Sequence, residues 1–129
     1  MEPQFYPFQS DKLAQRGYRV FPDELENDDH IFFHATAAEN LDSILEKGLL
    51  PGSELGGDLM TISYATNSTI ALTYWTYVRA RGQEGVILVL RFPSLDEIFL
   101  REGTHYSVAL KTQPAIIGAC RIPGTYEHR

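Results

Sequence analysis

The sequence predicts a single α+β domain. Two segments with helical spacing alternate with strand-like apolar runs, and only strand-like runs follow, which predicts the order β-α-β-α-β-β-β. The length of 129 residues suits one domain of ordinary size. Hydrophobic residues make up 43% and charged residues 22%, which is typical of a folded globular chain. We therefore expect one domain over residues 1–129, with residues 1–29 as an irregular lead-in.

The first structured elements follow this lead-in. Residues 1–29 contain several aromatic residues and prolines, and they end in the acidic stretch 23–29, which we expect to be a solvated loop. Residues 30–34 form a short apolar run typical of a strand. Thr36 and Glu39 then match a capping box, and the helix that they introduce is expected to end at Lys47 and Gly48.

The second half of the pattern repeats this alternation. Residues 59–65 predict a strand, and Asn67 or Ser68 is expected to cap a helix over residues 69–81. Residues 85–92 are continuously apolar and β-branched, which is typical of a buried strand. Two further strands are expected over residues 106–110 and 116–122. The side chains expected on the apolar side of the second helix are Ile70, Ala71, Tyr74, Trp75 and Val78.

Charge and composition exclude several classes of function. The net charge is −6 and the basic residues are scattered, which disfavours extensive binding to nucleic acid. The longest apolar runs, GVILVL and HIFF, are far shorter than a membrane helix, and the N-terminus has no secretory signal pattern. One cysteine cannot form an internal disulfide. We therefore expect a cytoplasmic protein with no membrane partner.

Metal chemistry is also not expected. Cys120 has no partner cysteine, and its simplest interpretation is a small apolar residue in a strand rather than a reactive thiol. His30 and His34 would lie on one face of a strand but about 13 Å apart, too far to share a metal ion.

A set of polar and aromatic residues remains as a candidate site. His34 and Thr36 lie where the first strand leads into a helix, and Tyr64 lies near the end of the next strand. Each has a plain structural alternative: His34 as a buried hydrogen-bonding residue and Thr36 as a helix cap. The aromatic stripe formed by Tyr74, Trp75 and Tyr77 is expected to be part of the core.

Taken in order, these segments resemble the first half of the ADP-ribosyltransferase fold. That superfamily includes diphtheria-toxin-like and poly(ADP-ribose) polymerase-like transferases and RNA 2′-phosphotransferases. The resemblance covers about residues 30–92 and is found in FFHATAAENLDSILEKGLLPG, TISYATNSTIALTYW and GVILVLRF. The helix motif of the superfamily is matched by Leu41, Ile44, Gly48, Leu49 and Pro51, with one additional residue between Gly48 and Pro51.

The resemblance implies a split antiparallel sheet that holds NAD as co-substrate in a central cleft. His34 would bind ribose hydroxyl groups on the nicotinamide side, with Ala35 and Thr36 beside it. Tyr64, or Ser63 if the alignment shifts by one residue, would contact the nicotinamide ring. Tyr74 is the further candidate for cofactor binding.

The resemblance also implies a late strand that bears a catalytic glutamate in active transferases. The corresponding positions here are His105, Tyr106 and Ser107, and none of these three is acidic. Glu102 is the nearest carboxylate, and Glu127 lies close to the end of the chain. Glu102 and His105 are therefore the further catalytic candidates beside His34 and Tyr64.

The expected function is transfer of ADP-ribose from NAD to an acceptor, with release of nicotinamide, as in a compact toxin-type enzyme. One alternative is a non-catalytic module that binds NAD, ADP-ribose or a protein, and another is a 2′-phosphotransferase-like enzyme. The acceptor, whether protein or nucleic acid, is left open because it depends on loops such as residues 52–59. An antitoxin or regulatory partner is also left open.

Overall fold

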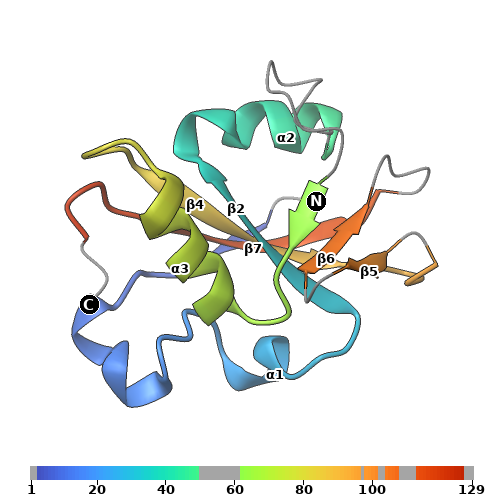
Figure 1. The fold of residues 1–129 in the computed structure, drawn as a ribbon, viewed down its shortest axis with the longest axis horizontal. Coiled ribbons are helices and arrows are strands. Elements are labelled where there is room, and N and C mark those ends of the chain that lie inside the picture. The colour runs from blue at the N-terminus through green and yellow to red at the C-terminus, as the bar shows by residue number, and fades with distance from the viewer. Residues whose placement is uncertain (1–2, 50–61, 97, 102–103, 108–112, 127–129) are drawn as a thin grey trace.

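The computed structural model describes residues 3–49, 62–96, 98–101, 104–107 and 113–126. It confirms a mixed α+β fold with two sheets and a few helices (Figure 1). No helix within the described ranges has both the length and the apolar character needed to cross a membrane.

The larger sheet has four strands in the order β1-β7-β4-β2. Strand β4 pairs antiparallel with both β2 and β7, whereas β1 pairs parallel with β7, with Gln4 opposite Gly118. The expectation of an antiparallel sheet is therefore wrong for this edge, because the lead-in adds a parallel strand. The bounds are Gln4–Phe5 for β1, Ile31–Ala37 for β2, Gly85–Arg91 for β4 and Ala115–Ile122 for β7.

The smaller sheet has three antiparallel strands in the order β3-β6-β5. Its strands are β3 (Ile62–Tyr64), β5 (Phe99–Arg101) and β6 (Thr104–Ser107). An antiparallel bridge between Phe33 and Ala65 joins it to β2, the edge strand of the larger sheet. The late strand expected from residue 106 thus begins two residues earlier, at Thr104.

The helices are short. They are α1 (Asp23–Glu26), α2 (Leu41–Lys47) and α3 (Ser68–Val78), with 3-10 helices η1 (Ser10–Lys12), η2 (Ala14–Arg16) and η3 (Ala38–Asn40). Helix α2 ends at Lys47, and Gly48 follows it as the predicted stop. The φ of Gly48 is 82°, a conformation that glycine adopts without the strain that other residues would have. Helix α3 is capped by Asn67, whose Oδ1 accepts a hydrogen bond from the Ile70 amide at 3.0 Å. It ends at Val78, three residues before the predicted end.

The predicted capping box is wrong. Strand β2 continues through Thr36 to Ala37, and η3 precedes α2 without a side-chain cap. The Thr36 hydroxyl instead accepts a hydrogen bond from Asn40 Nδ2 at 3.0 Å. The pairing of Ala37 with Gly85 in the sheet explains the difference, because Ala37 would have to be the first helical residue after a cap at Thr36 and is extended instead.

Both faces of the larger sheet are buried, which explains the continuous apolar run of β4. On one face, Phe33, Ile87 and Cys120 pack with the buried side of α3. On the other face, Phe32, Leu88 and the α2 residues Leu41 and Ile44 share a second core cluster. In Figure 1, α3 and α2 accordingly cover different parts of the sheet.

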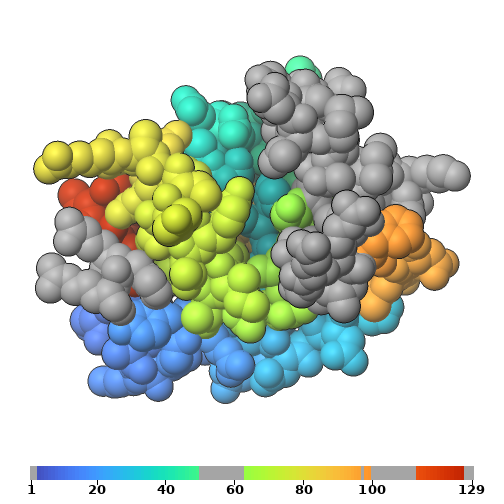
Figure 2. Space-filling view, viewed as in Figure 1, coloured from blue at the N-terminus to red at the C-terminus, as the bar shows by residue number. Residues whose placement is uncertain are grey.

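The buried side of α3 differs from the predicted one. Ala71, Leu72 and Trp75 are buried, and two of the five predicted residues are therefore confirmed. The other three, Ile70, Tyr74 and Val78, are about half exposed, at 52%, 52% and 49%. Tyr77 of the aromatic stripe is 90% exposed, so only Trp75 of that stripe belongs to the core. Figure 2 shows α3 at the surface of the molecule.

The acidic stretch is not a solvated loop throughout. Residues 23–26 form α1, and the Glu26 side chain is only 7% exposed. Its carboxylate accepts hydrogen bonds from the Phe21 amide at 3.2 Å, from the Ser68 amide at 3.0 Å and from the Ser68 hydroxyl. The Ser68 hydroxyl in turn accepts a hydrogen bond from the Val20 amide at 2.7 Å. Glu26 therefore joins the lead-in to the start of α3.

Candidate functional site

The candidate site lies where the two sheets meet. Phe33 and Ala65 exchange two backbone hydrogen bonds, of 2.9 and 2.8 Å, and His34 follows directly on β2. Its ring Nδ1 lies 2.8 Å from the backbone oxygen of Ser63 on β3. The side chain of His34 thus spans the junction between the larger and the smaller sheet.

The contact with Ser63 fixes the tautomer of His34. A carbonyl oxygen can only accept a hydrogen bond, so Nδ1 carries the hydrogen and donates it. Burial of the ring lowers the pKa of His34, and the hydrogen bond to Ser63 raises it by a smaller amount. The imidazole is therefore neutral at neutral pH, and its Nε2 is a hydrogen-bond acceptor.

Tyr64 lies beside His34 but is packed into the core. Its side chain is 4% exposed, and its ring centroid lies 6.1 Å from that of Phe32, 5.3 Å from Phe92 and 6.2 Å from His34. A planar ligand could stack on Tyr64 only by displacing one of these neighbours. The adjacent Ser63 is exposed and, because strand residues alternate, faces the opposite way.

Residues of β2 divide between the two faces of the larger sheet. His34 and Thr36 are two positions apart and share a face with Phe32, whereas Ala35 packs against the core on the other face. Thr36 is partly buried and oriented by its hydrogen bond to Asn40. Of the three neighbouring residues predicted to bind the ribose, His34, Ala35 and Thr36, only His34 and Thr36 therefore lie on the face of β2 against which Tyr64 packs.

The remaining predicted residues are distributed differently. Tyr74 lies on α3, which covers the face of the sheet opposite to that of His34, so the structure does not bring the two together. His105 lies on β6, where the backbone register places it opposite Tyr64. Glu102 and Glu127 lie outside the described residues.

Two contributors were missed by reasoning from sequence. The Ser63 carbonyl oxygen orients His34, and Asn40 orients Thr36. No residue type identifies a backbone carbonyl as functional, because every residue has one. The sequence pattern of Thr36 and Glu39 predicts a capping box instead, and it assigns no role to Asn40.

In the part of the chain that the structure describes, no three side chains of His, Cys, Asp or Glu are grouped so that they could hold a metal ion. What the arrangement offers is directional hydrogen bonding by a neutral imidazole and a hydroxyl, which suits sugar hydroxyl groups.

Comparisons of the chain with protein-family models, with curated proteins and with solved structures found no match.

Proposed function

We propose that the protein is an NAD-dependent ADP-ribosyltransferase. The observation that supports this most directly is His34 at the junction of two sheets, with Nδ1 donating to the Ser63 carbonyl and Nε2 left to accept. This matches what the sequence resemblance requires of that residue, namely to bind a ribose hydroxyl group. Thr36, on the same face of β2, is the second group for the same sugar.

The proposed reaction breaks the bond between the nicotinamide nitrogen and the anomeric carbon of the ribose. Nicotinamide leaves with the electron pair, the acceptor forms the new bond to the anomeric carbon, and the acceptor proton passes to solvent. His34 acts by orienting the ribose through a hydrogen bond from its hydroxyl group to Nε2. A neutral imidazole suits this role better than a charged one, because only the neutral ring can accept.

The test compares two histidines of the same strand region. His34→Asn keeps an amide donor for the Ser63 carbonyl but removes the acceptor at Nε2. His30→Asn is the matched control, because His30 Nδ1 makes the same kind of contact with the Phe92 carbonyl, at 2.9 Å, away from the junction. We expect NAD to raise the melting temperature of the wild type and of His30→Asn, with release of nicotinamide.

His34→Asn should lose about tenfold or more in NAD affinity, the effect of one buried hydrogen bond to a ligand. Equal NAD responses of His34→Asn and the wild type would contradict the assigned role. A wild type that neither binds NAD nor releases nicotinamide would contradict the proposal as a whole.

A non-catalytic binding module is the second candidate, and one observation favours it. Strand β6 has the sequence THYS, so it provides no carboxylate where active transferases of the resembling superfamily have a glutamate. Stabilisation by NAD without release of nicotinamide, across a panel of protein and nucleic-acid acceptors, would favour this module over the enzyme.

A further inference from the structure

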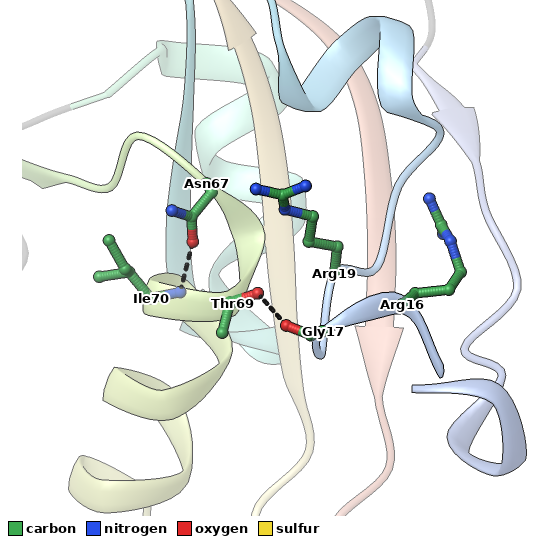
Figure 3. A pocket seen from close by; sticks show the side chains of 6 residues that line it. All are labelled: Arg16, Gly17, Arg19, Asn67, Thr69 and Ile70. Atoms are coloured by element: carbon green, nitrogen blue, oxygen red, sulfur yellow. Dashed lines mark hydrogen bonds between the residues drawn. The ribbon is translucent and has the colours of Figure 1, made fainter. Parts of the chain in front are cut away.

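A second concave feature lies at the seam between the lead-in and the start of α3. It is an open hollow of about 570 Å³, lined by Arg16, Gly17, Arg19, Asn67, Thr69 and Ile70 (Figure 3). It uses none of the residues of the candidate site at His34. Its volume lies within the range typical of small-molecule sites, about 300–1,000 Å³.

The two walls of the hollow are held together by hydrogen bonds. The Thr69 hydroxyl donates to the Gly17 carbonyl at 2.8 Å, and the Val20 amide donates to the Ser68 hydroxyl at 2.7 Å. Gly17 has a φ of 64°, so it turns the lead-in toward α3 in a conformation that glycine adopts without strain. The hollow is therefore a fixed feature of the fold rather than a gap between independent segments.

Its positive charge comes from two arginines with different surroundings. Arg16 is held by the Phe21 carbonyl at 2.6 Å and by the Asp23 carboxylate at 3.3 Å, which offsets its charge. Arg19 is exposed, and its guanidinium group makes no hydrogen bond or ion pair with the residues that the structure describes. Figure 3 shows the Arg19 side chain extending toward Asn67, whereas Arg16 points away from α3.

The start of α3 provides few free backbone amide donors to the hollow. The Ile70 amide already donates to Asn67 and the Ser68 amide to Glu26, so these two groups are not available to a ligand. Arg19 is thus the main unneutralised charge at the hollow, beside the polar side chains of Asn67 and Thr69. A guanidinium group with its donors free is suited to the paired oxygens of a phosphate group.

We propose that this hollow binds the phosphate group of a small phosphorylated molecule. Arg19 binds the phosphate oxygens, and the Asn67 amide group, whose nitrogen is a further donor, lies beside them. The hollow is larger than a phosphate ion needs, so there is room for the remainder of a molecule about the size of a sugar phosphate. This site does not depend on the function proposed for His34.

The test uses ribose 5-phosphate as probe and ribose as its uncharged counterpart, with binding followed through the backbone amide signals of Gly17, Thr69 and Ile70. We expect saturable shifts of these signals with ribose 5-phosphate only. Arg19→Gln should weaken the affinity about tenfold or more, because it removes a charge-assisted pair of hydrogen bonds. Arg81→Gln, which removes the same charge from another exposed position, should bind as the wild type does.

The proposal is overturned if the shifts do not saturate, if ribose alone produces them, or if Arg19→Gln and Arg81→Gln weaken binding equally. The last result would indicate general attraction between charges rather than a site. The His34→Asn variant separates this result from the function proposed above: its affinity for NAD should be weakened, and its response to ribose 5-phosphate should be that of the wild type.

Discussion

At the residue scale, burial of the Glu26 carboxylate depends on partners from distant parts of the sequence. Two of its three hydrogen-bond donors belong to Ser68, 42 positions later, and the third is the Phe21 amide. The local sequence around Glu26 is strongly acidic, so it predicts a solvated segment. Burial of a carboxylate is strongly unfavourable unless hydrogen-bond donors surround it. The donors from Ser68 are distant in sequence, so the sequence around Glu26 could not identify them.

Removing the charge of Glu26 should therefore destabilise the protein. In Glu26→Gln, one amide oxygen replaces two carboxylate oxygens, and the amide nitrogen brings a donor into a cluster of donors. We expect the free energy of unfolding to fall by about 1–3 kcal/mol, measured by urea denaturation. Glu24→Gln, on the exposed side of α1, should change it by less than about 0.5 kcal/mol. Equal effects would contradict the buried network.

The lowered pKa of His34 predicts a dependence of stability on pH. The unfolded chain takes up a proton on His34 near its ordinary pKa of about 6.5, whereas burial keeps the folded ring neutral to lower pH. The resulting stabilisation is complete above the unfolded pKa and is lost as the pH falls through the folded pKa.

Urea denaturation of the wild type and of His34→Asn between about pH 8 and pH 5 tests this sign. The wild type should lose stability relative to the variant as the pH falls, because the variant cannot titrate. Parallel pH profiles of the two proteins would show that the folded state does not depress the pKa of His34.

At the scale of elements, α3 illustrates where periodicity becomes ambiguous. Two apolar stripes share this helix: Ala71, Leu72 and Trp75 on the buried side, and Ile70, Tyr74 and Val78 on the exposed side. Both have helical spacing, so periodicity alone does not select between them. Which stripe is buried depends on the side chains of β2 and β4 against which α3 packs. The position of these strands relative to the helix could not be predicted from the sequence.

The burial of these stripes can be tested with two matched aliphatic truncations. Leu72→Ala should reduce the free energy of unfolding by about 2–5 kcal/mol, because Leu72 is fully buried and its removal leaves a cavity. Ile70→Ala should cost less than about 1 kcal/mol, because about half of Ile70 is already exposed. A larger loss for Ile70→Ala would mean that its side of the helix is covered in solution.

Elements determined by local pattern were predicted best. The buried strand at residues 85–92, the strand at 116–122 and the stop at Gly48 all follow from neighbouring residues, and the structure has them at or close to those positions. The same holds for the helix cap, which was expected at Asn67 or Ser68 and is Asn67. For the candidate site, the sequence located His34 on a strand but not its contact with Ser63. That contact joins residues 29 positions apart through a bridge between sheets, which no local pattern records.

At the scale of the whole molecule, the larger sheet encloses its only cysteine. Cys120 lies on β7, between β1 and β4, with 0% of its side chain exposed, and burial raises the pKa of its thiol to about 12. The reactive thiolate is therefore rare in the folded protein. A reagent can reach Cys120 only when the centre of the sheet opens.

Labelling of Cys120 should consequently report global unfolding. We expect slow modification by a thiol reagent near pH 8, with a rate that rises with urea in parallel with the unfolded fraction. The control is Tyr77→Cys in a Cys120→Ala background, because position 77 is 90% exposed and should react at once. If native Cys120 reacted as fast as this control, β7 would have to open without global unfolding.

The parallel pairing of β1 with β7 has a consequence for how the protein is made. Gln4 and Phe5 leave the ribosome long before Gly118 and Ala119, the residues that they pair with. During synthesis, β2 and β4 can already pair, while the aromatic lead-in lacks the strand that it needs. Completion of the sheet must therefore wait until residues 115–122 have emerged, and until then the aromatic side chains of the lead-in lack part of the core against which they pack.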